Sequence, residues 1–121
     1  MKVLLSIRPE FVEKIISGEK KFEYRRRIFK AEVESVIMYV SSPLKAVIGE
    51  FIVEDILMEN LNILWNLTKK YSGIDETFFW NYFHGKEKGY AIKIGKLRLY
   101  RKKLDLKKYF GILPPQSYVY I

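Results

Sequence analysis

The sequence predicts a domain of the α+β class, a mixed or antiparallel β-barrel with helices packed at its edges. The chain has 121 residues, the usual size of one domain, which predicts a single domain over residues 1–121. Its composition, 49% hydrophobic and 16% aromatic, supplies a packed core and excludes disorder as a description of the whole chain. Strand-like segments follow one another with connections too short for parallel crossovers, which favours an antiparallel or mixed sheet.

The first quarter of the chain predicts a strand, a helix and a second strand. Lys2–Ile7 is short and apolar, as in a buried strand. Pro9 suits the first position of a helix and Gly18 its C-terminal cap. Between them, apolar residues recur at helical spacing: Phe11, Val12, Ile15 and Ile16. Lys20–Arg25 alternates aromatic and charged side chains, which predicts a strand with one solvent-exposed side.

The rest of the chain predicts three helices or helical turns and four more strands. Val33–Val40 and Lys45–Leu57 are expected strands, with Gly49 marking a bulge or a close approach of the backbone. The later elements are a helix through Leu61 and Thr68, a helix capped by Asp75, a strand over Tyr90–Tyr100 with a turn at Gly95-Lys96, a helical turn from Asp105 to Tyr109, and a strand over Ser117–Ile121.

Positive charge is concentrated at two places in the sequence. The net charge is +8, from 22 lysines and arginines against 14 acids. Residues 1–30 hold nine basic residues against four acids, residues 31–85 three against eight, and residues 86–108 ten against two. If the two basic segments meet in the fold, they form a positive face that attracts polyanions such as nucleic acid. The alternative is heat adaptation, in which abundant charge serves stability.

Several classes of site are excluded by composition. The absence of cysteine excludes disulfides, thiolate metal sites and cysteine nucleophiles, and His84 alone makes no multi-histidine metal site. We therefore expect no metal and no cofactor. The sequence has neither an apolar run of about 20 residues nor a signal peptide, so we expect a cytoplasmic protein without a membrane segment. The oligomeric state stays open.

The densest cluster of chemically active residues is Gly18–Arg27, where a helix ends and a strand begins. Glu23 and Arg25 are two apart on this strand and share a face. With Lys20, they could hold an anion while the carboxylate accepts a hydrogen bond or fixes a cation. The structural alternative is a solvated strand edge whose charges prevent edge-to-edge pairing.

The pattern Gly18-x-Lys20-x-x-Glu23-x-Arg25 resembles the G-x-K-x-x-E-x-R signature of the ASCH domain family, a branch of the PUA-like superfamily. Other segments are similar to small single-domain archaeal and bacterial members in the same order: Leu4–Glu10, Gly49–Phe51 and Pro114–Tyr118. The resemblance implies a PUA-like barrel with a cleft between the first helix and the sheet, lined by the signature strand.

The resemblance implies two kinds of activity. Most family members are proposed to bind RNA, whereas a few remove an acetyl group from acetylated cytidine or cut single-stranded RNA. In the deacetylating branch the signature lysine activates a threonine. Lys20 falls on that lysine, but Glu23 takes the place of the threonine, so this mechanism does not carry over unchanged. Lys20 and Glu23 remain the catalytic candidates. Burial and Arg25 would lower the pKa of Lys20 and Glu23 would raise it, which favours binding over amide hydrolysis.

We therefore expect a basic cleft that binds single-stranded RNA or a nucleotide-like ligand, with an enzyme acting on RNA or a modified nucleoside as the alternative. A protein-interaction module, resting on the acidic middle segment, is a third hypothesis. The expected ligand-binding residues are Arg8, Lys20, Glu23, Arg25, Tyr39, Ser41, Ser42, Gln116 and Ser117. Outer phosphate contacts are expected from Arg26, Arg27 and Lys102. Four large rings at helical spacing are interpreted as core: Phe78, Phe79, Tyr82 and Phe83.

Overall fold

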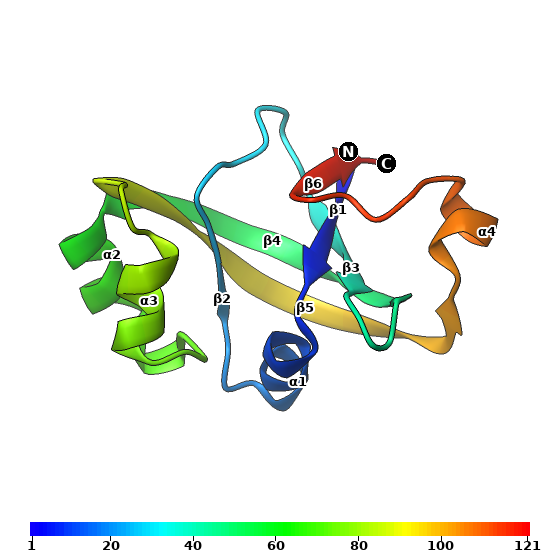
Figure 1. Cartoon of the computed structure of the whole chain (residues 1–121), viewed down its shortest axis with the longest axis horizontal. Helices are drawn as coiled ribbons and strands as arrows, with labels where there is room; N and C mark the ends of the chain where they lie inside the picture. The colour runs from blue at the N-terminus through cyan, green and yellow to red at the C-terminus, as the bar shows by residue number, and fades with distance from the viewer.

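The computed structural model describes all 121 residues and has one six-stranded sheet with helices at its ends and across one face (Figure 1). In chain order the elements are β1 (Lys2–Ile7), α1 (Pro9–Ser17), β2 (Phe22–Arg25), β3 (Ser35–Val40), β4 (Ala46–Asn60), α2 (Leu61–Thr68), the 3-10 turn η1 (Lys69–Tyr71), α3 (Glu76–Tyr82), β5 (Lys88–Leu104), α4 (Leu106–Phe110) and β6 (Tyr118–Tyr120). No helix is long and apolar enough to cross a membrane.

The sheet is mixed and curves into a half-barrel. Its strand order is β2-β5-β4-β3-β1-β6, and only β1 and β3 run parallel, in register from Lys2 opposite Ser35 to Ile7 opposite Val40. The connection between these two strands contains α1 and β2, which gives the chain the length that a parallel crossover needs. The long strands β4 and β5 cross the molecule, with α2 and α3 at one end and α4 at the other (Figure 1). The expected mixed barrel of the α+β class is confirmed in this half-barrel form.

The predicted helix boundaries agree with the structure because local signals set them. Pro9 is the first residue of α1, and Gly18 ends it in the left-handed conformation with φ 86°. Asp75 accepts a hydrogen bond from the backbone N–H of Phe78 and caps α3, and Asp105 caps α4 in the same way.

The two glycine predictions in the long strands have different outcomes. At Gly49 the pairing of β4 with both neighbours shifts register, as expected for a bulge, and a Cβ there would lie 2.5 Å from the carbonyl oxygen of Arg98. The predicted turn at Gly95-Lys96 is wrong, because β5 continues through it to Leu104. Gly95 instead lets the backbone approach Ile52 closely, since a Cβ would lie 3.0 Å from the Ile52 carbonyl oxygen.

Three apolar clusters hold the half-barrel together. The largest fills its inside, between α1 and the faces of β1, β3 and β4 that carry Val3, Val36 and Phe51. A second cluster, with Phe79 and Phe83 at its centre, packs α2 and α3 against β2 and β5. The third covers the outer face beneath α4. Side chains of α1, β2 and α3 are packed into the first two clusters. These packed elements therefore border the space between them at fixed positions.

Candidate functional site

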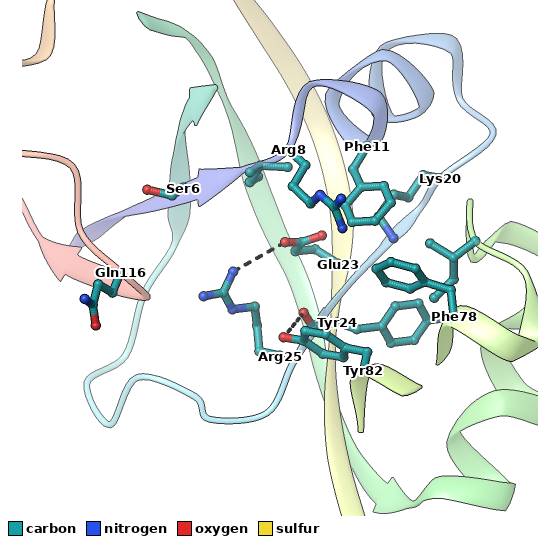
Figure 2. Close-up of a pocket in the computed structure, with 12 residues that line it drawn as sticks. Ser6, Arg8, Phe11, Lys20, Glu23, Tyr24, Arg25, Phe78, Tyr82 and Gln116 are labelled. Atoms are coloured by element: carbon teal, nitrogen blue, oxygen red, sulfur yellow. Dashed lines mark hydrogen bonds and ion pairs between the residues drawn. The ribbon is translucent and has the colours of Figure 1, made fainter. Parts of the chain in front are cut away.

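A pocket of about 240 Å³ opens where β1, α1, β2, α3 and the segment before β6 meet (Figure 2). Sites for drug-sized ligands have volumes of about 300–1,000 Å³, so this pocket suits a smaller group. It is lined by Ser6, Ile7, Arg8, Phe11, Lys20, Glu23, Tyr24, Arg25, Ile74, Phe78, Tyr82 and Gln116. Three cations and one carboxylate therefore share a small pocket with aromatic walls.

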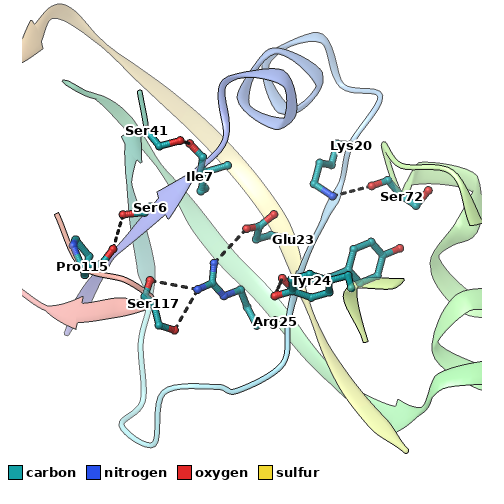
Figure 3. Close-up of polar contacts among 11 residues, drawn as sticks. Ser6, Ile7, Lys20, Glu23, Tyr24, Arg25, Ser41, Ser72, Pro115 and Ser117 are labelled. Atoms are coloured by element: carbon teal, nitrogen blue, oxygen red, sulfur yellow. Dashed lines mark hydrogen bonds and ion pairs between the residues drawn. The ribbon is translucent and has the colours of Figure 1, made fainter. Parts of the chain in front are cut away.

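Lys20 is buried at this pocket, although it precedes β2 in a stretch of charged residues. Its side chain is only 2% exposed, and Nζ donates a hydrogen bond to the carbonyl oxygen of Ser72 at 2.7 Å (Figure 3). The ammonium also lies 4.8 Å from the ring centroid of Tyr24 and 5.1 Å from that of Phe11. These rings and one carbonyl replace the water that an exposed lysine would have.

Burial lowers the pKa of Lys20 from 10.5 to about 8. The negative charge of Glu23 opposes this change by raising the pKa, and the positive charge of Lys14 adds to it. The predicted lowering by burial and raising by Glu23 are thus confirmed, whereas the cation that lowers the pKa is Lys14 rather than Arg25. A lysine with a pKa near 8 exchanges its proton close to neutral pH, which few lysines do.

Glu23 and Arg25 form the polar floor of the pocket. Glu23 is 5% exposed, and its Oε2 lies 3.5 Å from a terminal guanidinium nitrogen of Arg25. The other terminal nitrogen of Arg25 donates to the carbonyl oxygen of Ser117 at 3.2 Å and to its Oγ at 3.1 Å. The Glu23 carboxylate lies between Lys20 and Arg25 (Figures 2 and 3).

The prediction that the charged side of β2 faces solvent is therefore wrong. Glu23 pairs with Ile92 of β5, and both side chains point to the inside of the half-barrel, where Ile92 belongs to the large core cluster. Tyr24 pairs with Ala91 and points the other way, against α2 and α3. Both faces of β2 are therefore covered by other parts of the protein. The alternating polar and apolar side chains of this strand lie on two buried faces, one polar and one apolar.

Aromatic rings form the wall of the pocket opposite the floor. The rings of Phe11 in α1 and Phe78 in α3 pack edge to face, with their centroids 5.3 Å apart. The ring of Phe78 lies nearly parallel to that of Tyr82, with an interplanar angle of 11°. The Arg8 guanidinium lies 5.5 Å from the ring centroid of Phe11 and 5.7 Å from that of Phe78. Its side chain is 59% exposed and pairs with Glu10 on the surface, so Arg8 is the cation at the entrance.

The structure brings together six of the residues predicted to bind ligand. Arg8, Lys20, Glu23, Arg25 and Gln116 line the pocket, and Ser117 holds the Arg25 guanidinium from behind.

The structure does not bring Tyr39, Ser41 or Ser42 to the pocket. Tyr39 is 4% exposed and packs with Leu4 on the outer face of the sheet, because odd-numbered β3 side chains point away from the half-barrel interior. Ser41 follows β3, and its Oγ donates to the carbonyl oxygen of Ile7 at 3.5 Å (Figure 3). Its backbone N–H donates to the same oxygen at 3.0 Å. Ser42 is exposed in the turn. The structure therefore places these three residues outside the lining of the pocket.

The three predicted outer cations lie at separate places. Arg26 donates to the carbonyl oxygens of Tyr82 and His84 at 2.9 Å and 3.0 Å, so it caps the end of α3. Arg27 is exposed at the end of β2. Lys102 is exposed near the end of β5 beside α4, on the far side of the molecule from α3.

Sequence reasoning missed the aromatic wall and the partner of Lys20. Phe79 and Phe83 are fully buried, as predicted for core, but Phe78 and Tyr82 are half-buried and face the pocket. A helix with aromatic residues at i, i+1, i+4 and i+5 has two adjacent aromatic stripes. This wide aromatic surface was the one sequence feature that could have indicated a second, pocket-facing stripe. The Ser72 carbonyl carried no sequence signal, since any residue supplies a backbone oxygen. No group of three or more histidine, aspartate or glutamate side chains could hold a metal ion.

Comparison with known proteins identifies one family for most of the chain. The model of the ASCH domain matches residues 5–98, which include the second half of β1, all of α1 and β2, and most of the sheet. The chain belongs to the ASCH domain family. The segment Gly18–Arg25 lies inside the matched residues, and it forms the α1–β2 turn, β2 and the floor of the pocket.

The proteins that this chain is similar to differ in size and description. An ASCH domain-containing ribonuclease of Zymomonas mobilis is 32% identical over 124 residues, covering 99% of this chain and 84% of the relative. The crystal structure of ASCH from Zymomonas mobilis matches with a TM-score of 0.91 at 30% identity and covers 99% of this chain and 87% of that one. A large ribosomal subunit protein uL22 of Ureaplasma parvum is 32% identical over 90 residues, which are 74% of this chain and 29% of that protein.

Proposed function

We propose that this ASCH domain binds single-stranded RNA and seats one unpaired nucleotide in the pocket. The observation that carries the proposal is the floor of Lys20, Glu23 and Arg25 beneath aromatic walls. The 32% identity to an ASCH domain-containing ribonuclease across 99% of the chain supports RNA as the ligand class.

The polar floor offers what the edge of a nucleobase needs. Glu23 is an acceptor for an exocyclic amino or ring imino group, while Lys20 and Arg25 are donors for a base carbonyl or ring nitrogen. The parallel rings of Phe78 and Tyr82 offer an aromatic surface against which a base can stack. A base inside a duplex presents neither its face nor its pairing edge, so the ligand must be single-stranded or unstacked at this nucleotide.

The entrance supplies the phosphate contact. Arg8 is the most exposed cation of the pocket and is anchored against Phe11 and Phe78, so its guanidinium can turn to a phosphate by exchanging its surface pairing with Glu10. This contact would add affinity without choosing a base, whereas the floor would choose the base.

Cleavage of the bound RNA is the second candidate function, and the pKa of Lys20 favours it. With a pKa of about 8, about a tenth of the Lys20 side chains are neutral at pH 7 and can accept a proton. Lys20 would take the proton of a 2′-hydroxyl as that oxygen attacks the adjacent phosphorus and the bond to the 5′-oxygen breaks. Arg8 or Arg25 would balance the charge on the phosphate. The departing 5′-oxygen would take a proton from water, and Lys20 would later return its proton to solvent, so the products would be a 2′,3′-cyclic phosphate and a 5′-hydroxyl.

A filter-binding titration with single-stranded RNA, performed at several salt concentrations, tests the binding proposal. We expect affinity to fall as salt rises, and Glu23→Gln to weaken binding by about tenfold because it removes a charged acceptor. Glu32→Gln is the matched control, since it makes the same change of charge at an exposed residue that does not line the pocket. A wild-type protein that forms no complex at low salt would refute the proposal.

A gel assay of end-labelled single-stranded RNA tests cleavage separately. Lys20→Met and the wild type are incubated with the RNA in the presence of a chelator, and the termini of any product are identified. Products ending in a cyclic phosphate and absent from Lys20→Met are expected. Equal cleavage by both proteins would exclude Lys20 as the base.

A further inference from the structure

A second concave surface lies on the other side of the start of β2. This surface, the lysine groove, is a hollow of about 700 Å³ between β2, β5 and η1. Four lysines beside Lys20 line it: Lys21, Lys70, Lys93 and Lys96. The groove is larger and more basic than the pocket.

The lysine groove is where the two basic segments of the sequence meet. β2 pairs with β5 so that Phe22 lies opposite Lys93, and the backbone N–H of Ile94 donates to the carbonyl oxygen of Lys21 at 2.8 Å. Lys21 comes from the first basic segment, and Lys93 and Lys96 come from the last. Charges that are about 70 residues apart in sequence therefore add up on one surface.

Most of the charge in this groove has no acidic partner. Glu54 is the one acid that lines it, and its Oε1 lies 3.3 Å from Nζ of Lys93. Lys21, Lys70 and Lys96 have no carboxylate within 4.0 Å.

An aromatic ring holds two of these lysines in place. Nζ of Lys21 lies 4.5 Å, and Nζ of Lys70 5.6 Å, from the ring centroid of Tyr71. Lysine–aromatic contacts of this kind fix two ammonium groups at the groove while leaving them charged and free of a carboxylate.

The groove adjoins the proposed nucleotide pocket. The side chain of Lys20 lines both, and Gly18, Lys70 and Tyr71 are shared by the groove and a third hollow that continues past Gly73 to Ile74 at the pocket. A strand with one nucleotide in the pocket can thus continue around the end of α1 into the groove.

We propose that the lysine groove binds the phosphate backbone of the RNA strand that flanks the seated nucleotide. This inference rests on the proposed function. Lysine is a mobile point charge with no preference for base or sequence, so the groove contributes affinity and reach while the pocket reads the base.

The double variant Lys21→Gln/Lys96→Gln tests the groove. The control is Lys107→Gln/Lys108→Gln, which makes the same change of charge at exposed positions of α4 that line neither the groove nor the pocket. Fluorescence anisotropy measures binding of a single-stranded RNA of about 12 nucleotides and of a dinucleotide. Removing one lysine–phosphate pair lowers the slope of log affinity against log salt by about 0.7, so the slope for the groove variant should be shallower by about 1.4. Between about 50 and 200 mM salt, the affinity of the wild type should then fall by about sevenfold more than that of the groove variant.

The two RNA lengths separate the possible failures. Retained dinucleotide binding together with weaker binding of the longer RNA by the groove variant alone supports the proposal. If the groove and control variants bind the longer RNA equally, the groove inference is overturned and the proposed function stands. If the wild type binds neither RNA, both are overturned. Circular dichroism spectra matching the wild type establish that each variant is folded.

Discussion

Burying the charge of Lys20 should reduce the stability of the fold at neutral pH, and this reduction should disappear in alkaline solution. The pKa of this residue falls from 10.5 in the unfolded chain to about 8 in the folded one, and the side chain is only 2% exposed. At about 1.4 kcal/mol per pKa unit, the charged lysine costs the folded state about 3 kcal/mol below pH 8. Above pH 8 the folded protein has released the proton that the unfolded chain still binds, so stability rises with pH until about 10.5.

The variant Lys20→Met isolates this effect because methionine keeps the length of the side chain and removes the charge. Between pH 8 and about 9.5, the free energy of unfolding of the wild type should rise by about 2 kcal/mol relative to that of the variant. At pH 7 the variant gains about 3 kcal/mol because it buries no charge, but it leaves the Ser72 carbonyl without its donor, which costs about 1–3 kcal/mol. Its net stability at pH 7 should therefore equal or exceed that of the wild type.

Urea denaturation followed by the fluorescence of Trp65 and Trp80 measures both quantities. Other groups that titrate in this range are present in both proteins and cancel in the difference. Tyr24, whose pKa burial raises to about 12, keeps its proton in the folded protein throughout this range. Parallel stability curves for the two proteins from pH 7 to pH 9.5 would show that the lysine is not buried as a charge, and the reasoning about this site would fail.

Substitutions at Gly73 and Glu23 test the surroundings of Lys20, and Gly85→Ala is the control for the first. Gly73→Ala should destabilise the protein by about 2 kcal/mol and weaken RNA binding, because its φ is +68° and the new Cβ would lie 2.5 Å from Cβ of Lys20. Gly85 also has a positive φ, +83°, but a Cβ there would meet no atom within 4 Å, so Gly85→Ala should destabilise the protein by only about 1 kcal/mol. Thermal unfolding compares the two variants. Equal destabilisation would contradict the close approach at Gly73. Glu23→Gln should lower the pKa of Lys20 below about 8, because the carboxylate raises it, and should shift any pH profile of RNA cleavage to lower pH; a shift to higher pH would contradict the arrangement of these charges.

The elements of the fold followed from local patterns. Pro9 and Gly18 bound α1, and Asp75 and Asp105 cap helices by hydrogen bonds that span three residues, so a few neighbouring residues contain the whole signal. The turn expected at Gly95 failed for the opposite reason. Whether a glycine marks a turn or a close approach depends on what lies across from it, and here that is Ile52 of another strand.

The identity of the charged site residues also followed from the sequence, because the α1–β2 turn and β2 place Lys20, Glu23 and Arg25 at fixed offsets. Alternation of side chains does not reveal whether a polar face meets water or another part of the protein. Glu23 is buried because the half-barrel curves around it, and Tyr39 is buried on the outer face because α4 covers that side.

The amino-acid sequence by itself determined the order of helices and strands, the family signature and the two concentrations of positive charge, since each depends on residue types at short spacing. Only the tertiary structure decided the environment of those charges. Lys20 meets Ser72 across 52 residues and Arg25 meets Ser117 across 92, and Lys21 and Lys96 reach one groove only because β2 pairs with β5. Desolvation and summed charge depend on such distant contacts, and no local pattern in the chain encodes which distant residue will supply them.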